Sequence, residues 1–228
     1  MDEETTNVVD LQGSRAGRDR RSIAAVAVAA VLLVVVLAVA ALWWTGRGGG
    51  RSIVLYGDSI TMQTGPVFER VLGGEYEVTT DGIPNLRSTE RVESAATLAE
   101  GGPDQVIINL GTNDILQSGA LDEAEAALDR IGTTFAGARC VHLVTVNDKM
   151  VNFQDKTMNQ RAADLNRSIR ELAGRQGWGV VPWDEIVRDY DAAGSPEGPL
   201  TSDTVHPTDA VGQPKLAEAY RQALDGCS

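Results

Sequence analysis

Two short segments, far apart in the sequence, carry side chains that could together break an ester bond. Ser59 lies in the tetrapeptide GDSI at positions 57–60, and Asp203 lies three residues before His206 in the pentapeptide DTVHP. A carboxylate at that spacing can accept a hydrogen bond from Nδ1 of the imidazole, which leaves Nε2 free to take the proton of a serine hydroxyl. These residues predict a serine nucleophile with a histidine base. The competing interpretation of the first segment is an ordinary helix N-cap.

His206 is the candidate base because the chain offers few alternatives. The sequence contains two histidines, and the other, His142, lies in an apolar run between Val141 and Leu143. That position predicts a structural side chain within a strand. The competing interpretation of His206 is a histidine that serves only a turn or a helix cap.

Three further groups could stabilise the negative oxygen that develops on an attacked ester. The backbone N–H of Ser59 lies near the expected start of a helix, and Asn113, in the segment GTND at 111–114, offers a side-chain amide. Gly82 could donate its backbone N–H with no Cβ in the way. An ordinary turn glycine explains Gly82 equally well, so both interpretations remain open.

The elements that must position these groups follow a regular alternation of short apolar runs and amphipathic stretches. Such alternation indicates an α/β fold with a five-stranded parallel sheet and helices on both faces. Ligands of such sheets bind beyond the carboxyl ends of the strands, which is where the three loops described above are expected. The predicted strands are 53–56, 76–80, 105–110, 140–146 and 179–181, and the predicted helices are 65–72, 88–99, 121–135, 156–176 and 209–224.

Taken in order, these motifs give the region from Ile53 to the C-terminus a resemblance to the SGNH/GDSL hydrolase family of esterases and lipases. The segment GDSI at 57–60 is similar to the family's nucleophile block, with Ile60 in place of the common Leu. Residues 111–113 and 203–206 match the family's G-x-N and D-x-x-H blocks. The resemblance implies a three-layer, flavodoxin-like fold and ester hydrolysis that needs no metal or cofactor. It also implies that Gly82 is the oxyanion glycine.

Other functions fit the same residues. An acyl-enzyme on Ser59 could pass its acyl group to a sugar hydroxyl, which would make the protein an O-acyltransferase of cell-envelope polysaccharide. An inert domain that keeps only the fold and binds an envelope component is a third interpretation. A small-molecule, glycan or lipid ester is the expected substrate of the esterase.

Composition and spacing exclude several other classes. The 228 residues include 20 Lys and Arg against 32 Asp and Glu, a net charge of −12, so binding to nucleic acid is not expected. No phosphate-binding or dinucleotide-binding glycine motif is present, and the nucleophile block lacks the second glycine of a G-x-S-x-G elbow. Two histidines and two distant cysteines predict no metal cluster. The expected domain is a monomer.

The N-terminal region predicts a membrane anchor. Residues 23–42 are an unbroken run of Ala, Val, Leu and Ile, followed by Trp43 and Trp44, and a run of about 20 apolar residues spans a bilayer. The arginines before the run place the N-terminus in the cytoplasm. We therefore expect a cytoplasmic tail at 1–22, a transmembrane helix at 23–44, a linker at 45–51 and an exported domain at 52–228. The alternative is a cleaved signal peptide, with AVA at 38–40 as the cleavage pattern, and secretion.

Two cysteines and one group of loop residues complete the predictions. In an exported domain Cys140 and Cys227 are expected to form a disulfide that fixes the last helix, and two unrelated buried thiols are the alternative. Four residues after the fourth and fifth strands could either line a substrate pocket or only pack the loops: Asn147, Met150, Phe153 and Trp183.

Overall fold

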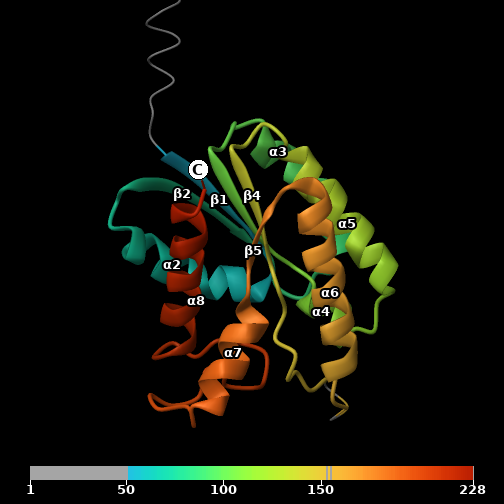
Figure 1. The fold of residues 1–228 in the computed structure, drawn as a ribbon. Coiled ribbons are helices and arrows are strands. Elements are labelled where there is room, and N and C mark those ends of the chain that lie inside the picture. Colours follow the sequence, from blue (N-terminus) through green and yellow to red (C-terminus); the bar gives the residue numbers. More distant parts are fainter. Residues whose placement is uncertain (1–50, 153, 155, 228) are drawn as a thin grey trace, which may run out of the picture. The chain divides into compact units, whose positions relative to one another are not determined.

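A five-stranded parallel sheet forms the centre of the domain. The computed structural model describes residues 51–152, 154 and 156–227. The strands are β1 (Arg51–Gly57), β2 (Tyr76–Gly82), β3 (Gln105–Asn109), β4 (Cys140–Val144) and β5 (Gly179–Val181), in the spatial order β2-β1-β3-β4-β5 (Figure 1). Every neighbouring pair is parallel. The predicted α/β class is confirmed and all five predicted strands are present, although β3 and β4 end at Asn109 and Val144, before the predicted ends at 110 and 146.

The strand order reverses direction at β1. The chain leaves β1 for the edge strand β2 and then crosses back to β3 on the other side of β1. In open parallel sheets, ligands bind in the crevice at the carboxyl ends of the strands where such a reversal occurs. Ser59 and Asn113, at the starts of the helices that follow β1 and β3, therefore lie where this rule places a ligand.

Burial explains why these segments form strands. Every residue of β3 is buried, and so are Ile53 to Gly57 of β1, because helices cover both faces of the central strands. The edge strand β2 alternates half-buried and exposed residues over most of its length. The apolar runs seen in the sequence are therefore the central strands of the sheet.

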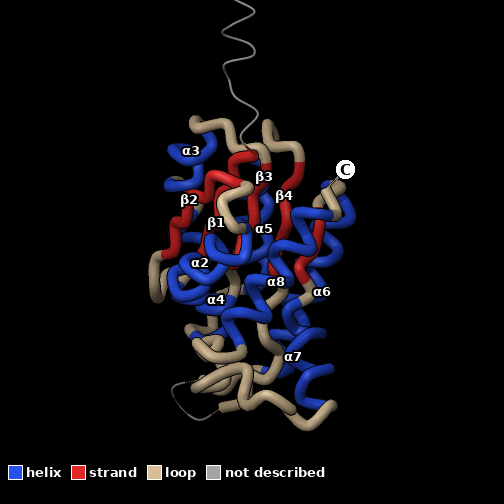
Figure 2. Tube along the Cα trace, turned by 90° about the vertical axis from the view of Figure 1, so that its left-hand side faces the viewer, coloured by secondary structure: helices blue, strands red, loops and turns tan. Residues whose placement is uncertain are grey.

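The helices lie in two layers. The long helices α2 (Ser59–Leu72) and α8 (Gly212–Asp225) pack together on one face, and α5 (Leu121–Thr134) and α6 (Asn159–Gln176) pack together on the other (Figure 1). Long loops gather below the carboxyl ends of the strands, around α7 (Figure 2). The shorter helices are η1 (Ser88–Arg91), α3 (Ser94–Ala99), α4 (Thr112–Leu116) and α7 (Trp183–Ala192).

Several predicted helix boundaries are wrong. The first helix begins at Ser59 instead of residue 65, because the side chain of Asp58 caps it and Pro66 is accommodated inside the helix. The predicted helix at 88–99 is divided into η1 and α3. The helices expected from 156 and 209 begin at Asn159 and Gly212. The helices α4 and α7 were not expected, since α4 is little more than one turn long and α7 directly follows Pro182.

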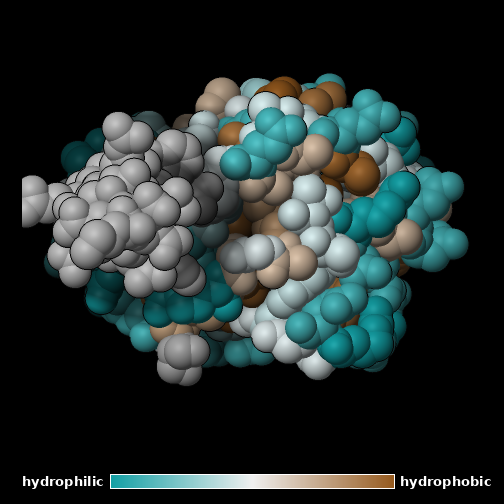
Figure 3. Space-filling view, turned by 90° about the horizontal axis from the view of Figure 1, so that it is seen from above, coloured by the Kyte–Doolittle hydropathy of each residue, from teal (hydrophilic) through white to brown (hydrophobic). Residues whose placement is uncertain are grey.

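The disulfide between Cys140 and Cys227 is present, with 6.1 Å between the Cα atoms. It joins the first residue of β4 to the chain just after α8. This pairing was predicted from the sequence. It ties the last helix to the end of the sheet where the strands begin. Viewed from that end, hydrophilic side chains cover most of the visible rim, with small apolar areas between them (Figure 3).

Over the residues that the structure describes, no helix combines the length and the apolar character needed to cross a membrane. The predicted tail and transmembrane helix, and the linker up to residue 50, lie outside the described residues, as does Phe153.

Candidate active site

Ser59 is the first residue of α2 and is separated from the end of β1 by Asp58 alone. The N-cap Asp58 accepts a hydrogen bond from the Ile60 amide through Oδ1, at 2.9 Å. Gly57 leaves no room for a side chain, because a Cβ there would lie 2.3 Å from the carbonyl oxygen of Asn109 on β3. Ser59 is half-buried at the carboxyl ends of the strands, after the tight turn between strand and helix. Asp58 therefore caps the helix, as the competing interpretation expected, and the role of Ser59 as nucleophile stays a prediction.

The structure brings the three predicted triad residues together although Ser59 and His206 lie far apart in the chain. Ser59 Oγ lies 3.0 Å from His206 Nε2, and His206 Nδ1 lies 2.7 Å from Asp203 Oδ2. The other carboxylate oxygen, Asp203 Oδ1, accepts the backbone N–H groups of Val205 and His206 at 3.0 and 2.7 Å. This is the arrangement in which an imidazole can take a proton from a serine hydroxyl. The roles of the three residues remain predictions.

The surroundings of Asp203 favour its charged form. Burial raises the pKa of Asp203, but hydrogen bonds from the amide and imidazole of His206 and from the Val205 amide outweigh this effect and lower the pKa below its ordinary value. The carboxylate is therefore ionised at neutral pH. An ionised carboxylate can hold the imidazole with its proton on Nδ1 and stabilise the imidazolium when it forms.

Asn147 holds the loop that carries His206. Its Nδ2 donates to the carbonyl oxygen of Thr204 at 2.8 Å, and the Thr204 hydroxyl oxygen accepts the Val151 amide at 3.0 Å. Thr204 has a φ of +68°, a left-handed conformation that a β-branched residue rarely adopts. These contacts therefore fix an otherwise unfavourable turn between Asp203 and His206.

Three of the four candidate pocket residues serve packing. Asn147 is 3% exposed and bonded to the histidine loop as described above, while Met150 and Trp183 are buried in the hydrophobic core. Of the two interpretations offered by the sequence, loop packing is the one that fits them.

Asn113 lies next to the nucleophile turn. It is buried in α4, which Gly111 starts with a φ of +116°, and a Cβ on Gly111 would lie 2.9 Å from Leu165 Cδ2. The Asn113 Nδ2 donates to Asp58 Oδ2 at 3.4 Å. The amide is therefore held against the residue that precedes Ser59, and its role as an oxyanion donor stays a prediction.

Gly82 ends β2 directly beside Gly57 of β1. A Cβ at Gly82 would lie 2.4 Å from the backbone nitrogen of Met62 in α2 and 2.7 Å from the carbonyl oxygen of Asp58. The next residue, Ile83, donates its N–H to the carbonyl oxygen of Gly57 at 3.1 Å. Close packing against α2 thus explains the glycine, and its oxyanion role stays a prediction.

Two buried carboxyl groups were missed as site residues by the sequence analysis. Asp58 is fully buried and joins the Ser59 turn to Asn113, and burial raises its pKa to about 7 against the opposing effects of the Ile60 amide and of His206. Asp114 Oδ2 accepts both the N–H and the hydroxyl of Ser88, at 2.9 and 2.8 Å, which links α4 to the segment after β2. In the sequence, only their positions next to Ser59 and Asn113 point to a role in the site, because burial depends on the tertiary structure.

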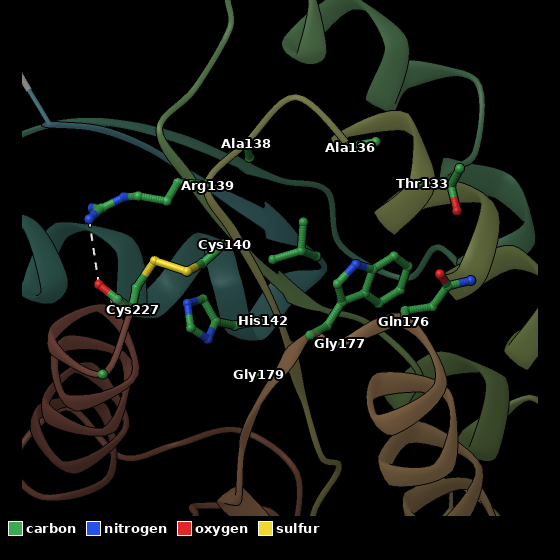
Figure 4. Close-up of a pocket in the computed structure, with 13 residues that line it drawn as sticks. Thr133, Ala136, Ala138, Arg139, Cys140, His142, Gln176, Gly177, Gly179 and Cys227 are labelled. Atoms are coloured by element: carbon green, nitrogen blue, oxygen red, sulfur yellow. Dashed lines mark hydrogen bonds between the residues drawn. A yellow bond between two sulfur atoms is a disulfide. The ribbon is translucent and has the colours of Figure 1, made fainter.

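A separate pocket lies at the opposite end of the sheet. Its volume is about 640 Å³, and residues at the starts of β4 and β5 line it, together with the disulfide and His142 (Figure 4). The potential ligand atoms of Cys140, His142 and Cys227 lie within 4.8 Å of one another, but the two sulfur atoms are bonded to each other and offer no thiolate. Burial lowers the pKa of His142 to about 4, so this imidazole is neutral at pH 7. It lies in β4, as predicted, and not at the Ser59 site.

Comparison with known proteins places this geometry in a family. Residues 55–213 match the model of the GDSL-like lipase/acylhydrolase family. No curated protein matches the chain.

Several solved structures share the fold at low sequence identity. The acetyl xylan esterase AlAXEase is 20% identical, with a TM-score of 0.65 over 76% of this chain and 99% of its own. The acetylxylan esterase Axe2 from Geobacillus stearothermophilus is 22% identical, with a TM-score of 0.63 over 78% of this chain and 95% of its own. LAE5, an α/β hydrolase enzyme from the metagenome of Lake Arreo, Spain, is 20% identical, with a TM-score of 0.61 over 78% of this chain and 96% of its own.

Proposed function

The chain belongs to the GDSL-like lipase/acylhydrolase family and is a serine hydrolase that acts on ester bonds, and we propose that it does so through an acyl-enzyme on Ser59. The observation that supports the proposal is the continuous line of contacts from Ser59 Oγ to His206 Nε2 at 3.0 Å and from His206 Nδ1 to Asp203 Oδ2 at 2.7 Å.

The reaction proceeds in two halves. His206 Nε2 takes the proton of Ser59 as Oγ attacks the ester carbonyl carbon, and the C–O bond to the alcohol breaks while His206 returns the proton to the leaving alkoxide. Water then attacks the acyl-enzyme in the same way and releases the acid and the free serine. Asp203 orients the imidazole, and the Ser59 amide, the Asn113 amide and the Gly82 amide hold the negative oxygen of both tetrahedral intermediates.

We propose an acyl or O-acetyl ester of a lipid or of an envelope glycan as the substrate. The presence of two acetylxylan esterases among the similar folds supports a carbohydrate ester as one member of this class. The described domain also carries its triad at the surface, with the Asp203 side chain 53% exposed, which suits an ester on a bulky molecule.

We further propose that the catalytic domain is extracytoplasmic and tethered to the membrane by residues 23–44. The apolar run at 23–42 and the arginines before it support the anchor and its orientation. The disulfide between Cys140 and Cys227 supports an oxidising compartment, because disulfides rarely persist in a reducing cytoplasm.

Replacing the nucleophile tests the reaction. In Ser59→Ala, hydrolysis of p-nitrophenyl butyrate should fall by ~10³-fold or more, because the remaining groups cannot form an acyl-enzyme. A fluorophosphonate should label Ser59 of the unaltered protein, as read by mass spectrometry of the labelled peptide. Ser202→Ala, which changes an exposed serine beside Asp203, is the matched control and should keep its activity. Undiminished turnover in Ser59→Ala would refute the assignment.

A further inference from the structure

Two large apolar side chains remain exposed beside the nucleophile. Among the residues that the structure describes, Met62 at 45% and Ile83 at 41% are the large hydrophobic side chains that are exposed to solvent. Single exposed apolar residues are common on protein surfaces, but these two come from different elements and both adjoin the Ser59 turn. Their shared location suggests a contact with substrate.

The backbone fixes both residues close to Ser59. Met62 lies three residues after Ser59 in α2, where side chains at that spacing share a helix face with Cβ atoms about 5–6 Å apart. Ile83 donates its N–H to the Gly57 carbonyl oxygen at 3.1 Å, two residues before Ser59. The close approach of Gly82 to the Met62 backbone nitrogen brings the two segments together. We call Met62 and Ile83 the apolar lip.

The apolar lip and His206 approach Ser59 from opposite sides. The His206 loop is bonded to Asn147 and Val151, which follow β4, whereas Ile83 follows β2. In the strand order β2-β1-β3-β4-β5, β2 and β4 lie on opposite sides of β1 and its serine. Because the base must give its proton to the leaving alcohol, the alcohol lies on the His206 side. The carbonyl oxygen and the acyl group then lie on the side of Ser59 away from His206, where Gly82 and the lip are found.

We propose that Met62 and Ile83 bind the acyl group of the ester and give the enzyme a preference for aliphatic acyl chains longer than acetyl. The inference rests on the proposed esterase function. A hydrocarbon chain gains from covering these two side chains, whereas sugar hydroxyls placed there would lose water without finding a hydrogen-bond partner. The lip therefore specifies the acid part of the substrate.

A panel of esters with one leaving group tests the assignment. The full chain and its variants are assayed on p-nitrophenyl acetate, butyrate, hexanoate and octanoate, and kcat/KM is measured for each. One fully covered methylene contributes a factor of about four, so the unaltered protein should prefer hexanoate to acetate by about ten-fold or more. Met62→Ser and Ile83→Ser should remove most of this preference, so that the ratio of kcat/KM on hexanoate to kcat/KM on acetate falls toward one.

Two controls separate specificity from damage to the fold. Met62→Leu keeps an apolar side chain and should restore the chain-length preference. Arg70→Ser changes another exposed residue of α2, far along the helix from Ser59, and should not alter the profile. Thermal unfolding should be similar in all variants, because the exchanged side chains are exposed.

The possible results distinguish this inference from the proposed function. If the enzyme is active but its kcat/KM does not vary with acyl chain length, either in the unaltered protein or in Met62→Ser and Ile83→Ser, the inference is overturned and the esterase assignment stays intact. The inference also fails if the variants instead change selectivity among acetate esters of different alcohols. Absence of all ester cleavage, together with no fluorophosphonate label on Ser59, overturns the proposed function and the inference with it.

Discussion

At the scale of single residues, Asp58 connects two parts of the site that lie far apart in the sequence, the start of α2 at Ser59 and Asn113 in α4. One of its carboxylate oxygens caps α2 beneath Ser59, and the other accepts the side-chain amide of Asn113. The nucleophile and the predicted oxyanion donor are thus positioned by one buried side chain. Replacing the Asn113 amide should therefore affect mainly catalysis, whereas replacing the Asp58 carboxyl group should affect stability in a pH-dependent way.

Asn113→Ala should lower kcat by ~10² to 10³ with little change in KM, because the lost amide would stabilise the transition state more than the bound ester. Steady-state kinetics on p-nitrophenyl butyrate measure the two constants. Asn113→Asp, which keeps the size but replaces the donor by a carboxylate next to Asp58, should show a loss at least as large. Gln117→Ala, at the exposed end of the same helix, is the control. A kcat within two-fold of normal in Asn113→Ala would remove this residue from the oxyanion site.

The raised pKa of Asp58 predicts a pH-dependent loss of stability. The folded protein retains the Asp58 proton up to a pH of about 7, whereas the unfolded chain loses it near 3.8, so the folded state binds more protons between these values. The contribution of Asp58 to the free energy of unfolding is therefore fully present below about pH 4 and declines as the pH rises to about 7.

Urea unfolding at a series of pH values, compared between the unaltered protein and Asp58→Asn, isolates this contribution. The difference in unfolding free energy should shift in favour of the variant as the pH increases from 4 to 7. If the unfolding free energies of the two proteins change in parallel with pH, Asp58 titrates alike in the folded and unfolded states and the prediction is wrong.

The triad residues could be predicted from the sequence because their types and local spacing carry the signal. The D-x-x-H spacing already allows the Asp203 to His206 bond that the structure contains. The contributions of Asp58 and Asn147 could not be predicted in the same way. Each depends on burial and on a hydrogen bond across a long stretch of chain, to Asn113 in one case and to Thr204 in the other.

At the scale of elements, the strands were more predictable than the helices. Strands such as β3 are buried on all sides and so consist of continuous apolar sequence. The start of α2 was misplaced because Pro66 resembles a helix start, while the actual start depends on the Asp58 cap. The division of residues 88–99 reflects tertiary contacts of η1, where Ser88 is bound by Asp114.

The disulfide supplies a prediction for α8. Its two cysteines are separated by 87 residues in the sequence, and removing a disulfide of this kind typically costs about 2–5 kcal/mol of stability. Paired replacement, Cys140→Ser with Cys227→Ser, should lower the free energy of unfolding by that amount in guanidinium titrations. Activity of the folded variant should persist, because the bond lies at the starts of the strands and Ser59 follows a strand end. Equal stability of both proteins, or loss of activity in the folded variant, would contradict this description.

At the scale of the whole molecule, the strand order determines which loops meet. The sequence predicted a parallel sheet and a site at its carboxyl edge, and the reversal at β1 explains why the loops after β1 and β3 share that site. The pairing order itself was not predictable from local sequence, since it depends on which apolar strands become neighbours. The placement of residues 1–50 lies outside what the structure describes.

The proposed anchor is tested in cells. The full chain should sediment with membranes and resist alkaline extraction, and protease added to intact cells should degrade the domain. A variant without residues 1–44 should remain in the soluble fraction of the cytoplasm. Recovery of the native protein from the medium, cut near residue 40, would support the signal-peptide alternative and refute the anchor.

The direction of β1 has a practical consequence for anything joined ahead of the domain. Arg51 begins this strand and Ser59 follows its far end, so at about 3.3 Å per residue the strand separates the point of attachment from the nucleophile by roughly 20 Å. A bead, a tag or a fusion partner coupled upstream of Arg51 would therefore meet the domain at the rim remote from the chemistry. An enzyme immobilised in this way would therefore still be open to polymeric esters, because the point of attachment lies away from Ser59.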